Sequence, residues 1–203
     1  MAIAVPMKDA YGRIARYYSW LSNLVFGNVL KEANRAFLES IVEKSIMIIG
    51  GGDGKSYVGL EENLLGEFWE KSPAMLKLAK KHLSGSKLKF QLGEFQSKRK
   101  ADFIFLPFVL DTLSDEQLEK LLLQLRENLN PSGKVVFSDF FPPTAFLQKT
   151  ILRLMILFFR LVTSHSRMDL PDYESFFQKT GYRKVDEKSW ENRWIRTQMW
   201  VLA

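Results

Sequence analysis

A cluster of glycines directly follows a short apolar run, and this order limits the fold more than any other feature of the chain. The run covers residues 46–49, and the cluster consists of Gly50, Gly51, Gly52, Asp53 and Gly54. A short run rich in β-branched residues is typical of a buried parallel strand. Glycines at its end let the backbone turn sharply and approach a ligand closely. Glu70 ends the next predicted strand, 65–70, where a carboxylate can bind ribose hydroxyls. The sequence therefore predicts a nucleotide pocket.

The spacing of the glycines separates three possible ligands. A dinucleotide site with G-x-G-x-x-G would need glycine at position 55, which is Lys55. A phosphate loop matches at Gly54-Lys55-Ser56, but its first glycine would fall on Ile49. What remains is G-x-G-x-G followed by an acidic residue, the pattern of methyltransferases that use S-adenosyl-L-methionine (SAM), a ligand with a ribose but no phosphate.

Three further stretches carry a family resemblance. Residues 70–80 resemble the E-x-S-x-x-M-L-x-x-A-[RK] stretch of small-molecule class I methyltransferases, and residues 129–135 resemble their L-x-P-G-G-x-[LV] turn. Residues 11–19 resemble the Y-D-x-x-A-x-x-Y-D element of the ubiquinone/menaquinone-biosynthesis-like group. The chain is thus similar to class I SAM-dependent methyltransferases over nearly its whole length. It departs from them at several positions: Gly12, Ser19, Ile48, which stands where many members have an acid, and Ser132.

The alternation of strands and helices predicts one α/β domain over 1–203, with an N-terminal helical flap (1–42), a SAM-binding core (43–141) and a C-terminal part (142–203). The expected fold is a doubly wound, Rossmann-like, seven-stranded, mostly parallel sheet that ends in an antiparallel hairpin. We expect strands at 46–49, 65–70, 87–92, 102–107, 134–139, 182–190 and 194–202. We expect helices at 55–62, 73–83, 114–129, 146–162 and 172–180.

The resemblance also implies a cofactor site for SAM. Gly50, Gly52 and Gly54 would turn the backbone beneath the methionine part, and Glu70 would bind the ribose. Lys71 and Ser72 would form the edge of the adenosine pocket, and Glu94 and Phe95 would flank the adenine. The wall nearest the sulfur would consist of Leu106, Pro107 and Phe108. The aromatic residues of the N-terminal segment, among them Tyr11, Tyr18 and Phe26, would pack as a flap over the site.

Methyl transfer needs a general base only if the acceptor must lose a proton. By position after the strands, the candidates for this base are Asp111, Asp139 and His165. Each has a structural alternative, because Asp111 could cap a helix, Asp139 could bind loop backbone and His165 could be solvated. We expect no metal site, since two histidines and no cysteine cannot furnish the usual zinc ligands.

The segment 146–162 is mostly apolar, with Lys149, Arg153 and Arg160 on one helical face. It is too interrupted by charge to span a bilayer. A helix buried on the sheet, a lining for an acceptor pocket and contact with a membrane surface all remain open. The expected partner is a small, lipophilic or aromatic acceptor.

The composition of the chain limits which cellular locations and which other functions are compatible with the sequence. A chain without cysteine fits a reducing cytoplasm, and the first residues show no secretion signal. The net charge of +6 is compatible with binding to a nucleic acid, but no N-P-P-[YF] motif follows the fourth strand, and this argues against a nucleic-acid methyltransferase. A SAM-binding protein without transfer activity is the other alternative. The oligomeric state stays open.

Overall fold

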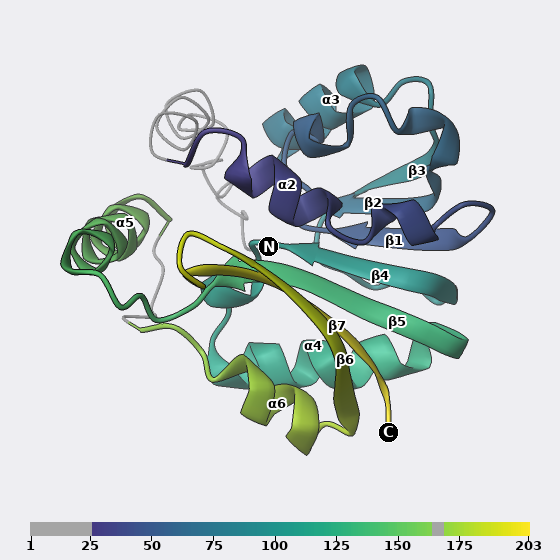
Figure 1. Cartoon of the computed structure of the whole chain (residues 1–203). Helices are drawn as coiled ribbons and strands as arrows, with labels where there is room; N and C mark the ends of the chain where they lie inside the picture. The colour runs from purple at the N-terminus through teal and green to yellow at the C-terminus, as the bar shows by residue number, and fades with distance from the viewer. Residues whose placement is uncertain (1–25, 164–168) are drawn as a thin grey trace, which may run out of the picture.

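The computed structural model describes residues 26–163 and 169–203, and its centre is a seven-stranded sheet (Figure 1). The strand order is β3-β2-β1-β4-β5-β7-β6. The first five strands pair in parallel, and β7 pairs antiparallel with both β5 and β6. The strands are β1 (Ser45–Ile49), β2 (Leu65–Glu70), β3 (Lys87–Leu92), β4 (Ala101–Pro107), β5 (Leu129–Phe140), β6 (Tyr182–Trp190) and β7 (Ile195–Leu202). This arrangement confirms the predicted fold class.

Helices cover both faces of the sheet. Helix α3 (Pro73–His82) lies on one face, while α4 (Asp115–Glu127) and α6 (Tyr173–Lys179) lie on the other (Figure 1). Each face has its own apolar core, with Ile48 and Phe68 on the α3 side and Leu106 on the α4 side. Helix α2 (Val29–Arg35) crosses the sheet near its carboxyl edge, and α5 (Phe146–Thr163) stands at one end of the molecule.

The carboxyl ends of the parallel strands meet at one edge, and backbone bonds extend the pairing beyond the strands. The Gly50 amide donates to the Trp69 carbonyl at 2.8 Å, and the Phe108 amide donates to the Ser138 carbonyl at 2.8 Å. The loops after β1, β2, β4 and β5 therefore start side by side. Ligands of open α/β sheets bind at such an edge.

The predicted helix at 55–62 was wrong. Two short 3-10 turns take its place, η2 (Lys55–Tyr57) and η3 (Glu61–Asn63). Gly59 separates them with φ of +89°, and its amide donates to the Glu61 carboxylate at 2.8 Å. A left-handed residue cannot continue an α-helix, so the segment folds as two turns.

The described part of the predicted flap, residues 26–42, contains α2 and the 3-10 turn η1 (Leu38–Ser40). A further 3-10 turn, η4 (Leu110–Thr112), follows β4. Within residues 26–163 and 169–203, no helix is both long and apolar enough to cross a membrane.

Candidate functional site

The glycine loop after β1 adopts the left-handed backbone that its sequence predicts. Gly50, Gly52 and Gly54 have φ of +75°, +60° and +74°. A Cβ on Gly50 would lie 2.9 Å from Val109, and one on Gly54 would lie 2.9 Å from Leu83. A Cβ on Gly52 would meet no described atom within 4 Å. Gly50 and Gly54 are thus required by packing as well as by φ, whereas Gly52 presents its backbone to open space that a ligand can enter.

The carboxylate of Glu70 joins the glycine loop to the start of α3. Its Oε2 accepts from the Gly52 amide at 3.0 Å, and its Oε1 accepts from the Ser72 amide at 2.8 Å. Both bonds hold the carboxylate at the carboxyl end of β2. A carboxylate offers about four lone-pair sites, so these two bonds are compatible with further bonds from ribose hydroxyls.

The other residues predicted around adenosine also gather at the ends of β2 and β3. Lys71 forms an exposed ion pair with Glu94, with 3.1 Å between Nζ and Oε1. Phe95 makes an edge contact with Trp69 at 5.6 Å between ring centroids. The hydroxyl of Ser72 caps α3 by accepting from the Met75 amide at 3.3 Å. The pairing of Lys71 with Glu94 was not predicted, because the two residues lie in different loops.

The wall predicted near the sulfur lies at the end of β4. The side chain of Leu106 is buried in the core on the α4 side, and Pro107 is buried as well. Phe108 is only partly buried and has φ of +50°, an unusual backbone conformation for an aromatic residue. It is therefore Phe108 that presents a ring at this edge.

Asp139 lies in the interior and holds the loop after β4. Its Oδ2 accepts from the amides of Leu110 and Asp111 at 3.2 Å each, and its Oδ1 accepts from the Phe140 amide at 2.8 Å. Burial raises the pKa of Asp139 well above its usual value, the carboxylate of Asp111 raises it further, and the amide donors and Tyr173 lower it. These contacts favour the structural alternative named above for Asp139.

Four rings gather at the same edge, and we call them the aromatic cluster: Phe26, Phe108, Phe140 and Trp194. The sequence predicted Phe108 in the wall near the sulfur and Phe26 in the flap, but sequence reasoning missed Phe140 and Trp194. Ring centroids are 5.3 Å apart for Phe26 and Phe140, 5.2 Å for Phe108 and Phe140, and 5.7 Å for Phe140 and Trp194. Trp194 is far away in sequence. The antiparallel pairing of β7 with β5 brings it to the cluster, where the Trp194 carbonyl accepts from the Phe141 amide at 2.7 Å.

The indole N–H of Trp194 is buried and has no hydrogen-bond acceptor among the residues that the structure describes. A buried donor without an acceptor is costly, and native structures rarely keep one without a reason. Helix α5 packs on the cluster through Ile151, Leu152 and Met155. The aromatic cluster thus combines packed apolar rings with one polar donor.

Helix α2 connects this cluster with the segment that follows the glycine loop. The Asn34 amide donates to the Ser56 hydroxyl at 3.2 Å, and Arg35 donates to the carbonyls of Ser56 and Val58. The Ala33 carbonyl accepts from the hydroxyls of Ser138 on β5 and Thr197 on β7.

Three predicted residues, Tyr11, Tyr18 and His165, lie outside the described residues. Within the described ranges, no group of three or more potential ligands could hold a metal ion. The residues present do fit SAM, since Gly52 leaves room for close backbone approach and the Glu70 carboxylate stands beside it.

Residues 23–197 match a protein family described as a methyltransferase domain. No curated protein matches the sequence. Among solved structures, the chain is similar to a TehB-like SAM-dependent methyltransferase from Corynebacterium glutamicum ATCC 13032, with 12% identity and a TM-score of 0.66, over 96% of this chain and 99% of that one.

Two longer structures are also similar. One is the mitomycin 7-O-methyltransferase MmcR, with 18% identity and a TM-score of 0.70 over 95% of this chain and 60% of that one. The other is an O-methyltransferase family 2 protein from Planctomyces limnophilus DSM 3776 in complex with apigenin, with 15% identity and a TM-score of 0.69 over 97% and 62%. The chain spans about three fifths of the length of these two. Since the family match covers most of the chain, the protein belongs to the methyltransferase-domain family, and its fold is similar to that of SAM-dependent methyltransferases.

Proposed function

We propose that this protein transfers a methyl group from SAM to a small, lipophilic or aromatic acceptor that binds at the aromatic cluster. One observation carries the proposal. The glycine loop with Glu70 and the aromatic cluster occupy the same carboxyl edge of the sheet. Helix α2 is bonded both to Ser56, which follows the loop, and to Ser138 on β5, the strand that ends at Phe140. Segments 1–42, 43–141 and 142–203 would then act together as one methyltransferase domain.

On the cofactor side, we assign the ribose contact to Glu70 and the close backbone approach to Gly52, supported by Gly50 and Gly54. The Lys71–Glu94 ion pair and Phe95 would border adenine, and Ser72 would hold the start of α3 in place. Leu106 and Pro107 would contribute backbone near the sulfur, because their side chains are buried. Tyr11 and Tyr18 would cover the site.

When bound, SAM supplies an electrophilic methyl group on a positively charged sulfur. The protein then has to hold the acceptor in line with that group and exclude water, and good positioning alone can supply about 7–11 kcal/mol of the barrier. An apolar lining of Phe108, Phe140 and Trp194 serves both needs. It also disfavours charged acceptors, which would lose their hydration without a partner.

The Trp194 N–H further restricts the chemical class of the acceptor. A donor buried in an apolar lining gains a partner if the acceptor carries a carbonyl or ether oxygen beside the methylated atom. The similarity in fold to proteins named as O-methyltransferases, one of them in complex with apigenin, supports an oxygen-bearing ring compound.

No proton transfer is assigned to Asp139, because its carboxylate is occupied by backbone amides. Asp111 and His165 remain the candidates for a base if the acceptor must lose a proton. We propose a cytoplasmic location, with the enzyme close to the membranes that would hold an apolar acceptor.

A second candidate function, SAM binding without transfer, is favoured by Ile48. This residue is fully buried beneath the glycine loop, where many members of the family carry an acid. In this case SAM would bind and survive incubation with lipid or aromatic extracts without turnover.

A thermal shift series with SAM, its demethylated product, NAD and ATP with magnesium tests the cofactor assignment. We expect stabilisation by the first two ligands only, with dissociation constants in the micromolar range. Stabilisation by ATP with magnesium and none by SAM would refute the assignment, because Gly54-Lys55-Ser56 would then be a phosphate site.

A further inference from the structure

Helix α5 has two different faces. Its inner face, with Ile151, Leu152 and Met155, packs on the aromatic cluster. Its outer face leaves three large apolar side chains in solvent, Phe146 at 85% exposed, Leu147 at 70% and Leu154 at 61%. Single exposed apolar residues are ordinary, but three on one helix face mark an interaction surface. We call these three residues the outer face of α5.

The charges carried by α5 itself all have one sign. Lys149 and Arg153 are exposed on the same helix. The whole stretch 140–168 contains four cationic residues and no aspartate or glutamate, although the chain as a whole contains 23 acidic residues. An amphipathic helix with large apolar residues and only cations is the pattern that binds the interface of anionic membranes.

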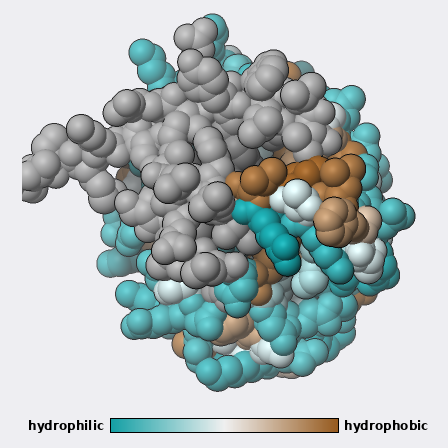
Figure 2. Space-filling view, turned by 90° about the vertical axis from the view of Figure 1, so that its left-hand side faces the viewer, coloured by the Kyte–Doolittle hydropathy of each residue, from teal (hydrophilic) through white to brown (hydrophobic). Residues whose placement is uncertain are grey.

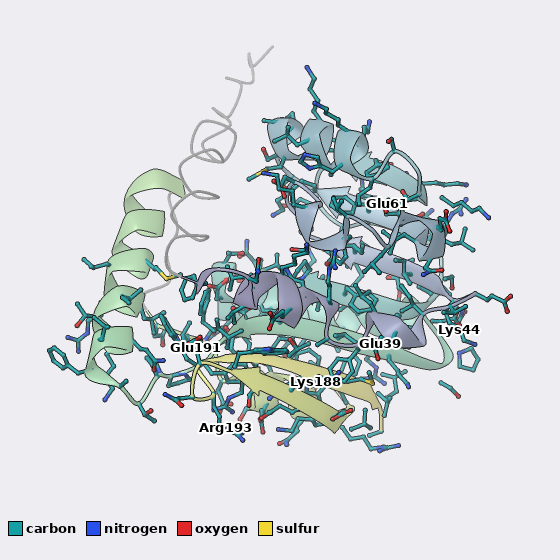
Figure 3. The ribbon with its side chains drawn as sticks, turned by 45° about the horizontal axis from the view of Figure 1, so that its top comes forward. Glu39, Lys44, Glu61, Lys188, Glu191 and Arg193 are labelled. Atoms are coloured by element: carbon teal, nitrogen blue, oxygen red, sulfur yellow. The ribbon has the colours of Figure 1, made fainter. Side chains whose placement is uncertain are left out.

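The helix is held at the edge of the molecule, where it can reach a flat surface. Gln148 donates to the Glu191 carbonyl at 3.1 Å, which ties the first turns of α5 to the turn between β6 and β7. Figure 3 shows Glu191 and Arg193 at this turn, beside one end of the helix. In Figure 2, which views the side of the molecule where α5 lies, apolar surface adjoins hydrophilic surface.

We propose that the outer face of α5 docks on an anionic lipid bilayer, so that a lipophilic acceptor can pass from the bilayer to the aromatic cluster beneath the helix. Phe146, Leu147 and Leu154 would enter the boundary between headgroups and acyl chains, while Lys149 and Arg153 would pair with lipid phosphates. This docking proposal rests on the proposed function, because it assumes a lipophilic acceptor and identifies the lipid bilayer as its source.

A second copy of the chain is a poorer occupant of this surface. In a symmetric dimer the same patch lies on both partners, which would bring Lys149 and Arg153 of each copy close to those of the other. Three exposed side chains also offer little area compared with the roughly 800 Å² per partner of a stable interface. An anionic bilayer instead complements the cations.

Flotation with vesicles tests the docking surface. Vesicles of phosphatidylcholine, alone or mixed with phosphatidylglycerol, are incubated with the full chain and with three double variants. Phe146→Ser/Leu147→Ser removes apolar side chains, and Lys149→Gln/Arg153→Gln removes charge. Lys80→Gln/Lys81→Gln removes the same charge from exposed positions on α3, well away from α5 (Figure 1), and serves as the matched control.

We expect wild type to float with anionic vesicles and not with neutral ones. A lipid-facing cation contributes about 1 kcal/mol, so the charge variant should partition about 30-fold more weakly. The apolar variant should lose at least about tenfold. The α3 control should lose less than about threefold, because its lysines would not face the lipid.

Absence of wild-type flotation, or equal losses in the α3 control and the α5 charge variant, would overturn the proposal. A dimer in sedimentation that Phe146→Ser/Leu147→Ser abolishes would also overturn it, by assigning the face to a second copy. Calorimetric titration of SAM without vesicles distinguishes a failure of the docking surface from a failure of the proposed function. SAM binding without flotation leaves the proposed function standing and rejects only the docking surface.

Discussion

Replacing Glu70 with alanine should weaken SAM binding and loosen the loop at the same time. The carboxylate accepts from the amides of Gly52 and Ser72, and we assign it the ribose hydroxyls as well. A hydrogen bond to a charged group contributes about 1.5–3 kcal/mol, so loss of the ribose contact should lower affinity roughly tenfold to over a hundredfold. Glu70 is only half-buried, so losing the two amide bonds should lower the free energy of unfolding by only about 1–3 kcal/mol in total.

Calorimetric titration of SAM, together with urea denaturation of the ligand-free protein, measures the two effects separately. Glu70→Gln keeps the shape of the side chain but can accept from only one of the two amides, so its affinity should fall between wild type and Glu70→Ala. Glu61→Ala is the matched control, because Glu61 also accepts one backbone amide, that of Gly59. Its SAM affinity should equal that of wild type. An affinity of Glu70→Ala within about twofold of wild type would refute the ribose assignment, whatever the change in stability.

Four other substitutions have distinct expected outcomes. Gly51→Ala should lower the free energy of unfolding by about 1–3 kcal/mol in urea denaturation, because its Cβ would lie 2.4 Å from the Phe68 ring, whereas Gly52→Ala should mainly lower the SAM affinity measured by calorimetry. A larger loss of SAM affinity in Gly51→Ala than in Gly52→Ala would contradict the assignment of the loop. Asp139→Asn tests the raised pKa of Asp139. The folded state binds this proton more tightly than the unfolded state, so the free energy of unfolding of wild type, measured relative to that of the variant, should fall as pH rises from about 4 to 7. Denaturant titrations in which wild type instead gains stability relative to the variant over this range would contradict the shift. Trp194→Phe keeps an aromatic ring but removes the N–H, so KM for an oxygen-bearing acceptor should rise about tenfold with SAM affinity unchanged, and an unchanged KM would remove the donor role.

The fold was predictable because local pattern and tertiary structure agree along most of the chain. The strands at 65–70, 87–92 and 182–190 have the bounds that the apolar runs and turn residues predict. The predicted helix at 55–62 failed because one left-handed residue, Gly59, outweighs the helical periodicity around it. The strand predicted at 134–139 extends back to Leu129, across an irregularity in its pairing with β4.

The site was predictable only where it is local in sequence. Gly52 and Glu70 belong to motifs of a few residues, and the structure joins them by a hydrogen bond. The aromatic cluster combines residues from position 26 to position 194, and no short pattern contains that pairing. Phe108 was predicted as part of the wall nearest the sulfur. Phe140 directly follows the candidate Asp139, so a signal for Phe140 was available in the sequence. Placing Trp194 beside them required the antiparallel order of the last two strands.

The bonds of α2 have a consequence for how the protein responds to its ligands. Asn34 and Arg35 hold the segment after the glycine loop, while the carbonyl of Ala33, one residue earlier, holds β5 and β7. We therefore expect any ordering of the loop by SAM to reach the strands that carry the aromatic cluster through a single helical turn. Slower amide hydrogen exchange in β7 on addition of SAM, at a distance from any atom of the cofactor, would be the signature of this coupling, and it would favour an ordered mechanism in which the cofactor binds before the acceptor.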